Sequence, residues 1–427
     1  MKNILTLNSI SPVINDIFDS TYNVANDVTA PIGIMLRSFK MHDYKLDKNT
    51  IAIARAGAGV NNIPIEDYAK EGVVVFNTPG ANANAVKELV LCALLLGSRK
   101  IVDGIEWTKT LKGQGEEVGK LVEKGKSAFS GKEILGKNLG VIGLGAIGAL
   151  VANSAISLGM DVIGYDPFLS VNAALRLSSS VKVVKDLDDL IKSCDYITIH
   201  IPFIASQNKG FINAGLIRKM KDGVVIINCA RGELVDTPSI LAALESGKVA
   251  CYVTDFPNAD VIGVKNVVAL PHLGASTPES EDNCAVMAAE KLIDYIENGN
   301  IRNSVNLPNA EMSATGEKIC IIHRNVPDTI SKITSVLGAN GVNIENMLSN
   351  SKKDFAYTVI DATGKTVEEQ PAEEAPAEAA ADASYTVGVC QLVEHPALDA
   401  ATEGFQDAQY KFENVDKYEM YYIAQTN

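Results

Sequence analysis

Short apolar runs alternate with longer segments of helical periodicity through the first three hundred residues. The runs that read as buried strands are TIAIARAG (50–57), GVVVFNT (72–78), NLGVIGLG (138–145), DVIGYD (161–166), DYITIHIP (195–202), GVVIINCA (223–230) and NVVALP (266–271). Residues 84–100 and 146–159 repeat apolar positions at helical spacing. This strand–helix–strand alternation predicts two doubly wound parallel sheets, with the polar, Gly- and Lys-rich segment 104–136 connecting them.

The pattern changes after residue 309. Residues 315–361 read as strand, turn, helix and two further strands, which predicts a small α+β unit. Residues 362–383 are rich in Glu, Ala and Pro, so we expect an acidic linker that cannot bury enough apolar surface to order itself. A last segment, 384–427, opens with the strand-like run SYTVGVCQLV and has no assigned role.

Composition narrows the class of protein. The chain has 427 residues, 47% of them hydrophobic, which is enough for two or three domains. Its formal net charge of -14 disfavours nucleic-acid binding. The seven cysteines have no metal-ligand or disulfide spacing, and no apolar run suits a signal peptide or a membrane span. We therefore expect a cytoplasmic protein without a metal site, with no nucleic-acid or membrane partner.

The segment 138–166 carries a glycine motif in its required context. Gly143, Gly145 and Gly148 form GxGxxG between a predicted strand and a predicted helix, and Asp166 ends the next strand. These glycines allow a tight turn, a close approach to a pyrophosphate and close packing of the helix on the sheet. Amides at the helix start, at Ala146 and Ile147, suit the phosphates. A carboxylate at the ribose repels a 2′-phosphate, so the motif predicts NAD rather than NADP.

Two further residues end predicted strands of the same sheet. Arg231 follows the run 223–230, and its planar guanidinium can bind a carboxylate with two hydrogen bonds. His272 follows the run 266–271 and can take the proton of a substrate hydroxyl. Because ligands bind at the carboxyl ends of parallel strands, both residues are candidates for catalysis.

The motifs GLGAIG, NCARGELVD and PHLGAST together resemble the D-2-hydroxyacid dehydrogenase family, specifically its phosphoglycerate dehydrogenase branch. LRSFK (36–40), ARAGAGVNNIP (54–64) and FNTPGANANAVKELVL (76–91) extend the resemblance, which covers about residues 1–360. It implies a flavodoxin-like substrate domain, residues 1–95 with 285–307 returning to it, and a Rossmann NAD domain, residues 96–284. It also implies that Arg231 holds the substrate and that His272 is the general acid/base.

The resemblance assigns further residues to the cofactor and to catalysis. It implies cofactor contacts for Thr78, Cys229, Ala230 and Asp255. An acidic partner would stabilise the charged histidine by ion pairing. The family usually has a glutamate there, whereas this chain has Asp260 at the matching position, one methylene shorter.

A phosphate site is expected in the N-terminal sheet. Arginines beside small residues and free amides suit an anion, and the candidates are Arg37, Ser38, Arg55, Ala56 and Gly57. These residues favour a phosphorylated hydroxy acid as substrate. The implied reaction is oxidation of 3-phospho-D-glycerate to 3-phosphohydroxypyruvate with NAD, the first step of serine synthesis.

Residues 315–361 resemble an ACT regulatory domain, and His323, Asn325 and Asn343 fall on positions that bind effector serine in related enzymes. Either the run after the linker completes this domain or the domain is truncated. The family also implies a homodimer or homotetramer. Two other functions stay open: another 2-hydroxyacid dehydrogenase, such as a glyoxylate or hydroxypyruvate reductase, and a non-catalytic NADH-sensing co-repressor.

Overall fold

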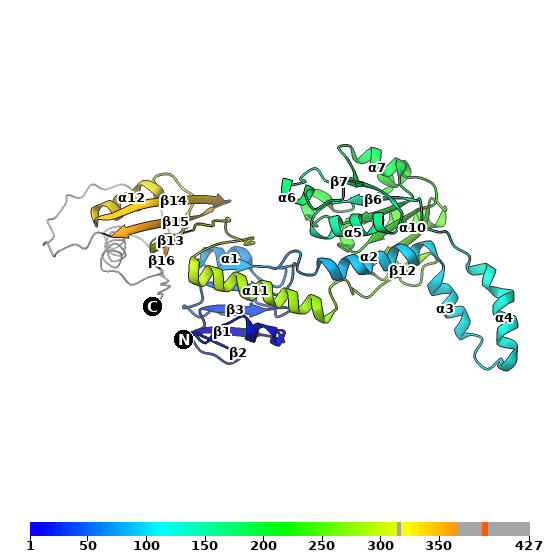
Figure 1. Ribbon diagram of the computed structural model, residues 1–427, viewed down its shortest axis with the longest axis horizontal. Helices are drawn as coiled ribbons and strands as arrows, with labels where there is room; N and C mark the ends of the chain where they lie inside the picture. The colour runs from blue at the N-terminus through cyan, green and yellow to red at the C-terminus, as the bar shows by residue number, and fades with distance from the viewer. Residues whose placement is uncertain (314–316, 365–386, 392–427) are drawn as a thin grey trace. The chain divides into compact units, whose positions relative to one another are not determined.

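The computed structural model describes residues 1–313, 317–364 and 387–391, which divide into two compact units (Figure 1). Unit 1 comprises residues 1–79 and the described residues from 281 onward, and unit 2 comprises residues 80–280. Unit 2 therefore starts before the predicted domain boundary at residue 96. The reason is that helix α2 (Ala83–Ser98) buries Val90, Ala93 and Leu94 in the apolar core of unit 2.

Unit 1 contains a five-stranded parallel sheet with the strand order β2-β1-β3-β4-β5. Its strands are β1 (Lys2–Leu7), β2 (Tyr22–Ala25), β3 (Gly33–Leu36), β4 (Ala52–Arg55) and β5 (Val74–Phe76). The same part of the chain forms three further elements: the helices α1 (Ile65–Lys70) and α11 (Pro278–Asn298) and the 3₁₀ turn η1 (Pro12–Asp16). Leu292 and Ile296 of α11 lie against Gly33. This is the predicted flavodoxin-like strand order.

Unit 2 contains a seven-stranded parallel sheet with the order β12-β11-β10-β9-β6-β7-β8. Its strands are β6 (Asn138–Ile142), β7 (Asp161–Tyr165), β8 (Lys182–Val184), β9 (Tyr196–Ile199), β10 (Val224–Asn228), β11 (Val249–Thr254) and β12 (Val267–Ala269). The chain order reverses between β6 and β9, which is where dinucleotides bind in such sheets. The Rossmann prediction is therefore confirmed.

Two apolar layers cover the faces of this sheet. One contains α2 and α5 (Ala146–Ser157), and the other contains α7 (Leu187–Ser193), α9 (Ala214–Lys219) and α10 (Thr237–Glu245). The short elements of the unit are α6 (Val171–Ala174), α8 (Ala205–Asn208) and η4 (Gly232–Leu234).

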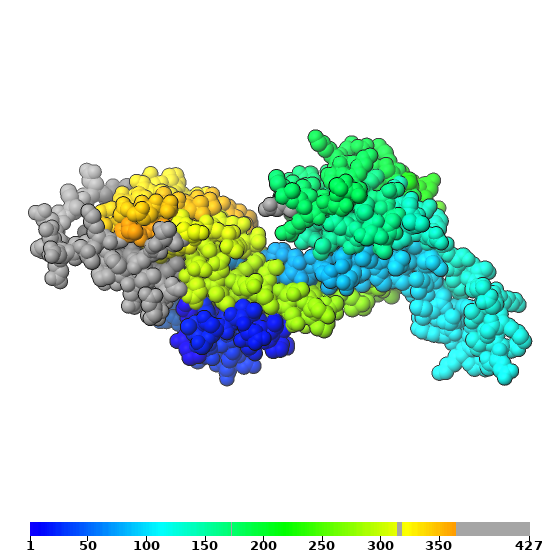
Figure 2. Space-filling model, in the orientation of Figure 1, coloured from blue at the N-terminus to red at the C-terminus, as the bar shows by residue number. Residues whose placement is uncertain are grey.

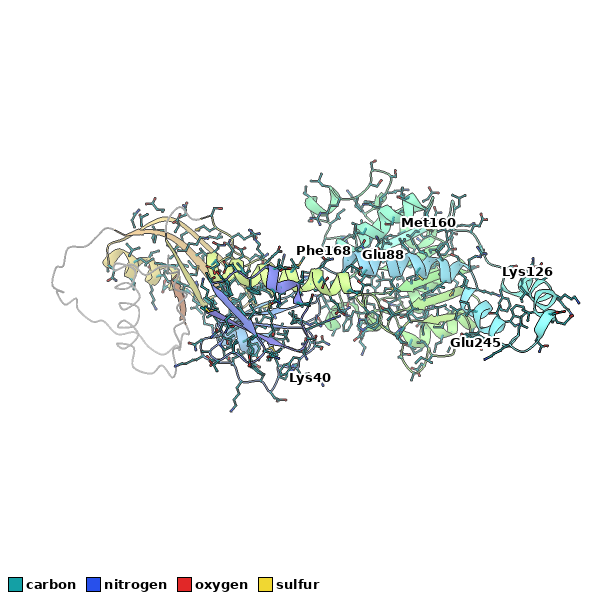
Figure 3. All side chains as sticks on the ribbon, turned by 60° about the horizontal axis from the view of Figure 1, so that its bottom comes forward. Lys40, Glu88, Lys126, Met160, Phe168 and Glu245 are labelled. Carbon is teal, nitrogen blue, oxygen red and sulfur yellow. The ribbon has the colours of Figure 1, made fainter. Side chains whose placement is uncertain are left out.

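The polar segment that joins the predicted sheets is helical. It forms α3 (Ile101–Lys109), η2 (Gly115–Glu117), α4 (Val118–Gly125) and η3 (Lys126–Phe129). Figure 2 shows this cyan segment projecting from the green body of unit 2, and Figure 3 labels Lys126 on it. The rings of Trp107 and Phe129 pack with centroids 5.2 Å apart, which holds α3 against η3.

The C-terminal part of unit 1 is a four-stranded antiparallel sheet with the order β14-β15-β13-β16 and one helix, α12 (Thr329–Ala339). Its strands are β13 (Glu317–Arg324), β14 (Val342–Lys352), β15 (Phe355–Gly364) and β16 (Val387–Gln391). β16 pairs with β13, so the run after the acidic segment supplies a fourth strand.

One sequence prediction needs adjustment here, and the others fall largely on residues that the structure does not describe. Residues 362–364 belong to β15 rather than to the linker, because Ala362, Thr363 and Gly364 pair with the start of β14. The rest of the predicted linker, 365–383, lies outside the described residues, as do residues 384–386 and 392–427 of the last segment.

Candidate functional site

The glycine motif forms the turn between β6 and α5. Gly143 has φ +91°, and a Cβ there would lie 2.6 Å from the carbonyl oxygen of His200. A Cβ on Gly148 would lie 1.9 Å from the carbonyl oxygen of Gly143. A Cβ on Gly145 would meet nothing within 4 Å. Two glycines are thus required by packing, whereas the third faces open space, as close approach of a ligand to the backbone requires.

The start of α5 offers amides to an anion. Gly145 is the N-cap residue and supplies no side-chain cap, so the amides of the first turn, which contains Ala146 and Ile147, are not capped by it. Asp166 follows β7 and accepts hydrogen bonds from the amides of Leu144 (2.9 Å) and Phe168 (2.9 Å). These bonds fix the carboxylate beside the glycine turn, and its contact with the ribose of NAD stays a prediction.

Arg231 follows β10 in a turn that Asn228 organises. The buried Asn228 side chain donates to the carbonyl of Arg231 (2.8 Å) and accepts from the amide of Ala230 (3.2 Å). Arg231 Nη1 donates to the carbonyl of Ala230 (2.7 Å). The neighbouring Cys229 is buried, which raises the pKa of its thiol to about 12 and keeps it neutral. The guanidinium itself is exposed at the sheet edge.

His272 lies on a strained turn that Asp255 holds. His272 has φ +56°, which is uncommon for a residue with a Cβ. The fully buried Asp255 accepts the amides of Leu273 (2.7 Å) and Gly274 (2.8 Å). The backbone beyond the histidine is therefore fixed, and the imidazole is presented at the surface.

Phe256 links the two candidate catalytic residues. Its ring centroid lies 4.5 Å from that of His272 and 5.7 Å from Cζ of Arg231. The structure thus brings together an imidazole and a guanidinium that sequence reasoning placed on one sheet edge. Phe256 itself was not singled out from the sequence.

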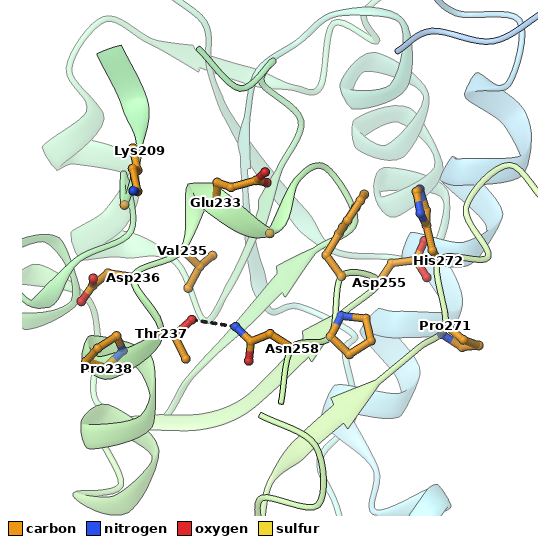
Figure 4. A pocket seen from close by; sticks show the side chains of 14 residues that line it. Lys209, Glu233, Val235, Asp236, Thr237, Pro238, Asp255, Asn258, Pro271 and His272 are labelled. Atoms are coloured by element: carbon orange, nitrogen blue, oxygen red, sulfur yellow. Dashed lines mark hydrogen bonds between the residues drawn. The ribbon is translucent and has the colours of Figure 1, made fainter. Parts of the chain in front are cut away.

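A cavity of about 790 Å³ adjoins His272 (Figure 4). Asp255, Phe256 and Glu233 line it, and Thr237 accepts a hydrogen bond from Asn258 at 3.0 Å on its wall. Asp260 is exposed and is not among the lining residues; its amide donates to Asn258 (3.1 Å). Within the described residues, the structure records no contact between Asp260 and His272, whereas Glu233, which sequence reasoning missed, shares the histidine's cavity.

His200 is a second histidine at this sheet edge that sequence reasoning missed. It follows β9, beside the reversal of strand order, and Nε2 lies 3.0 Å from Oγ1 of Thr198. Nδ1 is buried and has no hydrogen-bond partner among the described residues. Burial lowers the pKa of His200 to about 4, so the ring is neutral at physiological pH. The strand-end rule that singled out Arg231 would also have found it.

The phosphate candidates end adjacent strands of the sheet in unit 1. Leu36 pairs with Arg55, and the amide of Ala56 donates to the carbonyl of Leu36 (2.8 Å), so Arg37 follows β3 next to the end of β4, where Arg55 lies. Arg37 Nη1 lies 2.6 Å from Oε1 of Glu281. The guanidinium of Arg55 folds over Gly57, where a Cβ would lie 2.3 Å from Nη1. Ser38 is exposed.

Thr78 lies just beyond β5 in the same unit. It is fully buried, and its Oγ1 has no hydrogen-bond partner among the described residues. Its amide donates to the carbonyl of Gly57 (3.1 Å). The residue predicted to touch the cofactor is therefore tied to the loop predicted to bind phosphate.

The predicted effector residues do not share one environment. His323 is buried, with Nδ1 2.8 Å from the carbonyl oxygen of Arg324 and Nε2 2.9 Å from Oγ1 of Thr358. Burial lowers its pKa. Asn325 and Asn343 are exposed, and Asn343 donates to Glu345 (2.7 Å). Within the described chain, both ring nitrogens of His323 are thus engaged by the protein itself.

No group of side chains suited to hold a metal ion occurs among residues 1–313, 317–364 and 387–391. Over the same ranges, every helix is too short or too polar to cross a membrane.

The amino-acid sequence of the chain is similar to those of known proteins over the region that carries these residues. Residues 92–274 match the model of the D-isomer specific 2-hydroxyacid dehydrogenase, NAD binding domain. A hydroxypyruvate reductase of Thermotoga maritima is 40% identical over 255 residues, 57% of this chain and 77% of the relative. A D-3-phosphoglycerate dehydrogenase of Archaeoglobus fulgidus is 38% identical over 273 residues, 62% of this chain and 49% of the relative. The chain thus spans about half the length of that relative.

A solved structure extends the comparison. The NAD⁺-bound 3-phosphoglycerate dehydrogenase of Entamoeba histolytica aligns with a TM-score of 0.55 at 27% identity. The alignment covers 71% of this chain and 98% of that one. The family match, residues 92–274, includes the glycine turn, Arg231 and His272.

Proposed function

The chain belongs to the family of D-isomer specific 2-hydroxyacid dehydrogenases, and on that premise we propose that it oxidises 3-phospho-D-glycerate to 3-phosphohydroxypyruvate with NAD. The observation that carries the reaction type is that Arg231 and His272 both contact the ring of Phe256. An acid/base group and a carboxylate-binding group at one sheet edge are what oxidation of a 2-hydroxy acid requires.

The glycine turn, the first turn of α5 and Asp166 would hold NAD, which when bound supplies the acceptor for the hydride. Arg231 binds the substrate carboxylate with two hydrogen bonds and orients the carbon that bears the hydroxyl. His272 takes the hydroxyl proton as that carbon becomes a carbonyl carbon and its hydrogen leaves with the bonding electrons. In this proposal Asp255 acts through the backbone, since its bonds to Leu273 and Gly274 hold the turn that carries His272.

The phosphorylated substrate is the finer part of the proposal. Arg37 and Arg55 end adjacent strands and supply positive charge for a phosphate. The name of the Archaeoglobus relative supports the same substrate. With this substrate, we propose that the chain catalyses the first step of serine synthesis in the cytoplasm. We also propose that it forms a homo-oligomer and that its four-stranded sheet acts as an ACT-like regulatory domain that binds serine. Asp260 is retained as the proposed acidic partner of His272.

Initial rates of NAD reduction with 3-phospho-D-glycerate and with D-glycerate, at mildly alkaline pH, test the proposal. We expect strong preference for the phosphorylated acid and a loss of about a hundred- to ten-thousandfold in kcat for His272→Ala. His42→Ala is the matched control, since His42 is an exposed histidine outside the proposed site. Wild-type activity in the His272 variant would remove the acid/base assignment.

A second candidate is reduction of hydroxypyruvate or glyoxylate, which the Thermotoga relative favours by its identity and coverage. Equal rates with both acids, and fast oxidation of NADH by hydroxypyruvate, would favour this function. Tight NADH binding without turnover would instead point to a sensor of the reduced cofactor.

A further inference from the structure

Arg37, proposed above to bind the substrate phosphate, is paired with a carboxylate of its own chain. Arg37 follows β3, and Glu281 lies in the first turn of α11; Nη1 and Oε1 are 2.6 Å apart. We propose that Glu281 is an internal competitor for the phosphate, which must displace it from Arg37 to bind. Glu281 thereby sets the affinity for the phosphorylated acid and the selectivity over the unphosphorylated one. This inference deepens the proposed function and rests on it.

The ion pair is exposed enough to be exchanged. The side chains of Arg37 and Glu281 retain 36% and 47% of their accessible surface. An exposed pair of this kind contributes a factor of about five or less to an equilibrium constant, because water screens the charges. A phosphate offers more charge than a carboxylate and three acceptor oxygens, so it can replace Glu281 on the guanidinium.

The backbone of Arg37 is held independently of Glu281. Asn62 Nδ2 donates to the carbonyls of Phe39 (2.7 Å) and Arg37 (3.3 Å), and Leu36 pairs with Arg55. The start of α11 has its own anchor, because Ser11 Oγ donates to Asp282 at 2.5 Å. Removing the charge of Glu281 therefore leaves both partners in place and changes only the electrostatics.

Charge near the two arginines explains the expected selectivity. Arg37 and Arg55 supply two positive charges at adjacent strand ends, and Glu281 neutralises one of them. A phosphorylated acid must also approach the glutamate, whose like charge repels it. An unphosphorylated acid has no group to place on Arg37, so Glu281 does not affect its binding.

The test compares Glu281→Gln with wild type in the full chain. We expect KM for 3-phospho-D-glycerate to fall about fivefold and KM for D-glycerate to change less than twofold. In an Arg37→Gln background the Glu281→Gln change has no effect, because the two residues act as a unit. Glu290→Gln, at an exposed position of the same helix, is the control for net charge.

A binding measurement keeps the test independent of turnover. In calorimetric titration with inorganic phosphate, we expect Kd to fall about fivefold in Glu281→Gln and not in Glu290→Gln. Unchanged or weaker phosphate binding in Glu281→Gln overturns the inference. If 3-phospho-D-glycerate is not oxidised but the phosphate titration behaves as expected, the proposed substrate fails and the competition at Arg37 stands.

Discussion

The arginines at the carboxyl edges of the two parallel sheets differ in the contacts that the protein already makes with them. At the seven-stranded sheet of unit 2, Arg231 is exposed and has no carboxylate within ion-pair distance among the described residues. His200 Nδ1 at the same edge has no partner within that part of the chain. At the five-stranded sheet of unit 1, Arg37 pairs with Glu281 and Arg55 folds over Gly57.

The difference concerns what a ligand must do in each place. A ligand at the edge in unit 2 gains hydrogen bonds that the protein does not already make, which is the condition for strong and oriented binding. An anion that binds Arg37 in unit 1 exchanges one partner for another and gains only the difference. We therefore expect substitutions in unit 2 to affect catalysis strongly and substitutions in unit 1 to tune affinity.

After His272→Ala, the largest expected effect is that of Arg231→Gln. Loss of the bidentate contact to the carboxylate should lower kcat/KM about a hundred- to a thousandfold for both phosphorylated and unphosphorylated acids. Steady-state kinetics with each acid measures this, with Arg218→Gln, at an exposed position of α9, as the control. A loss of less than tenfold would show that the carboxylate binds elsewhere.

The next effect concerns His200 and pH. Its pKa falls from 6.5 to about 4 on folding because burial disfavours the charged ring. The unfolded chain therefore binds the proton first, so this contribution to stability is present above about pH 6.5 and is lost as the pH falls toward 4. Between pH 6.5 and pH 4, the free energy of unfolding should therefore fall by about 3 kcal/mol more in wild type than in His200→Gln.

Urea unfolding at pH 7, 5.5 and 4 measures this effect, with His42→Gln as the control at an exposed histidine. Parallel stability curves for wild type and His200→Gln would mean that the His200 ring is accessible to water in the folded protein.

The smallest effect is expected for Gly57→Ala. Gly57 has φ +151°, and the new Cβ would lie 2.3 Å from Nη1 of Arg55, so the guanidinium must move. We expect KM for the phosphorylated acid to rise severalfold and stability to fall by about 1 kcal/mol. Gly72→Ala is the control for backbone strain alone, because Gly72 has φ +74° but a new Cβ there would meet nothing within 4 Å. If both variants raise KM equally, strain rather than the position of Arg55 is responsible.

Much of the edge in unit 2 could be predicted from sequence. Gly143 and Gly148 have steric requirements set by the turn itself, and Arg231 and His272 each follow a legible apolar run. Asp260 was placed by counting from Asp255. It is not among the residues that line the cavity next to His272, and its pairing with His272 stays a prediction.

The sequence by itself determined the elements and the local turns. Strand alternation, helix periodicity and glycine sterics act between residues close together in the chain, so they are legible without a structure. Only the tertiary structure decided the partners: Glu281 on Arg37, Phe256 between Arg231 and His272, and the buried rings of His200 and His323. The physical reason is that charge pairing and desolvation depend on which distant segments pack together, and Arg37 and Glu281 are brought together only when α11 returns to the first sheet.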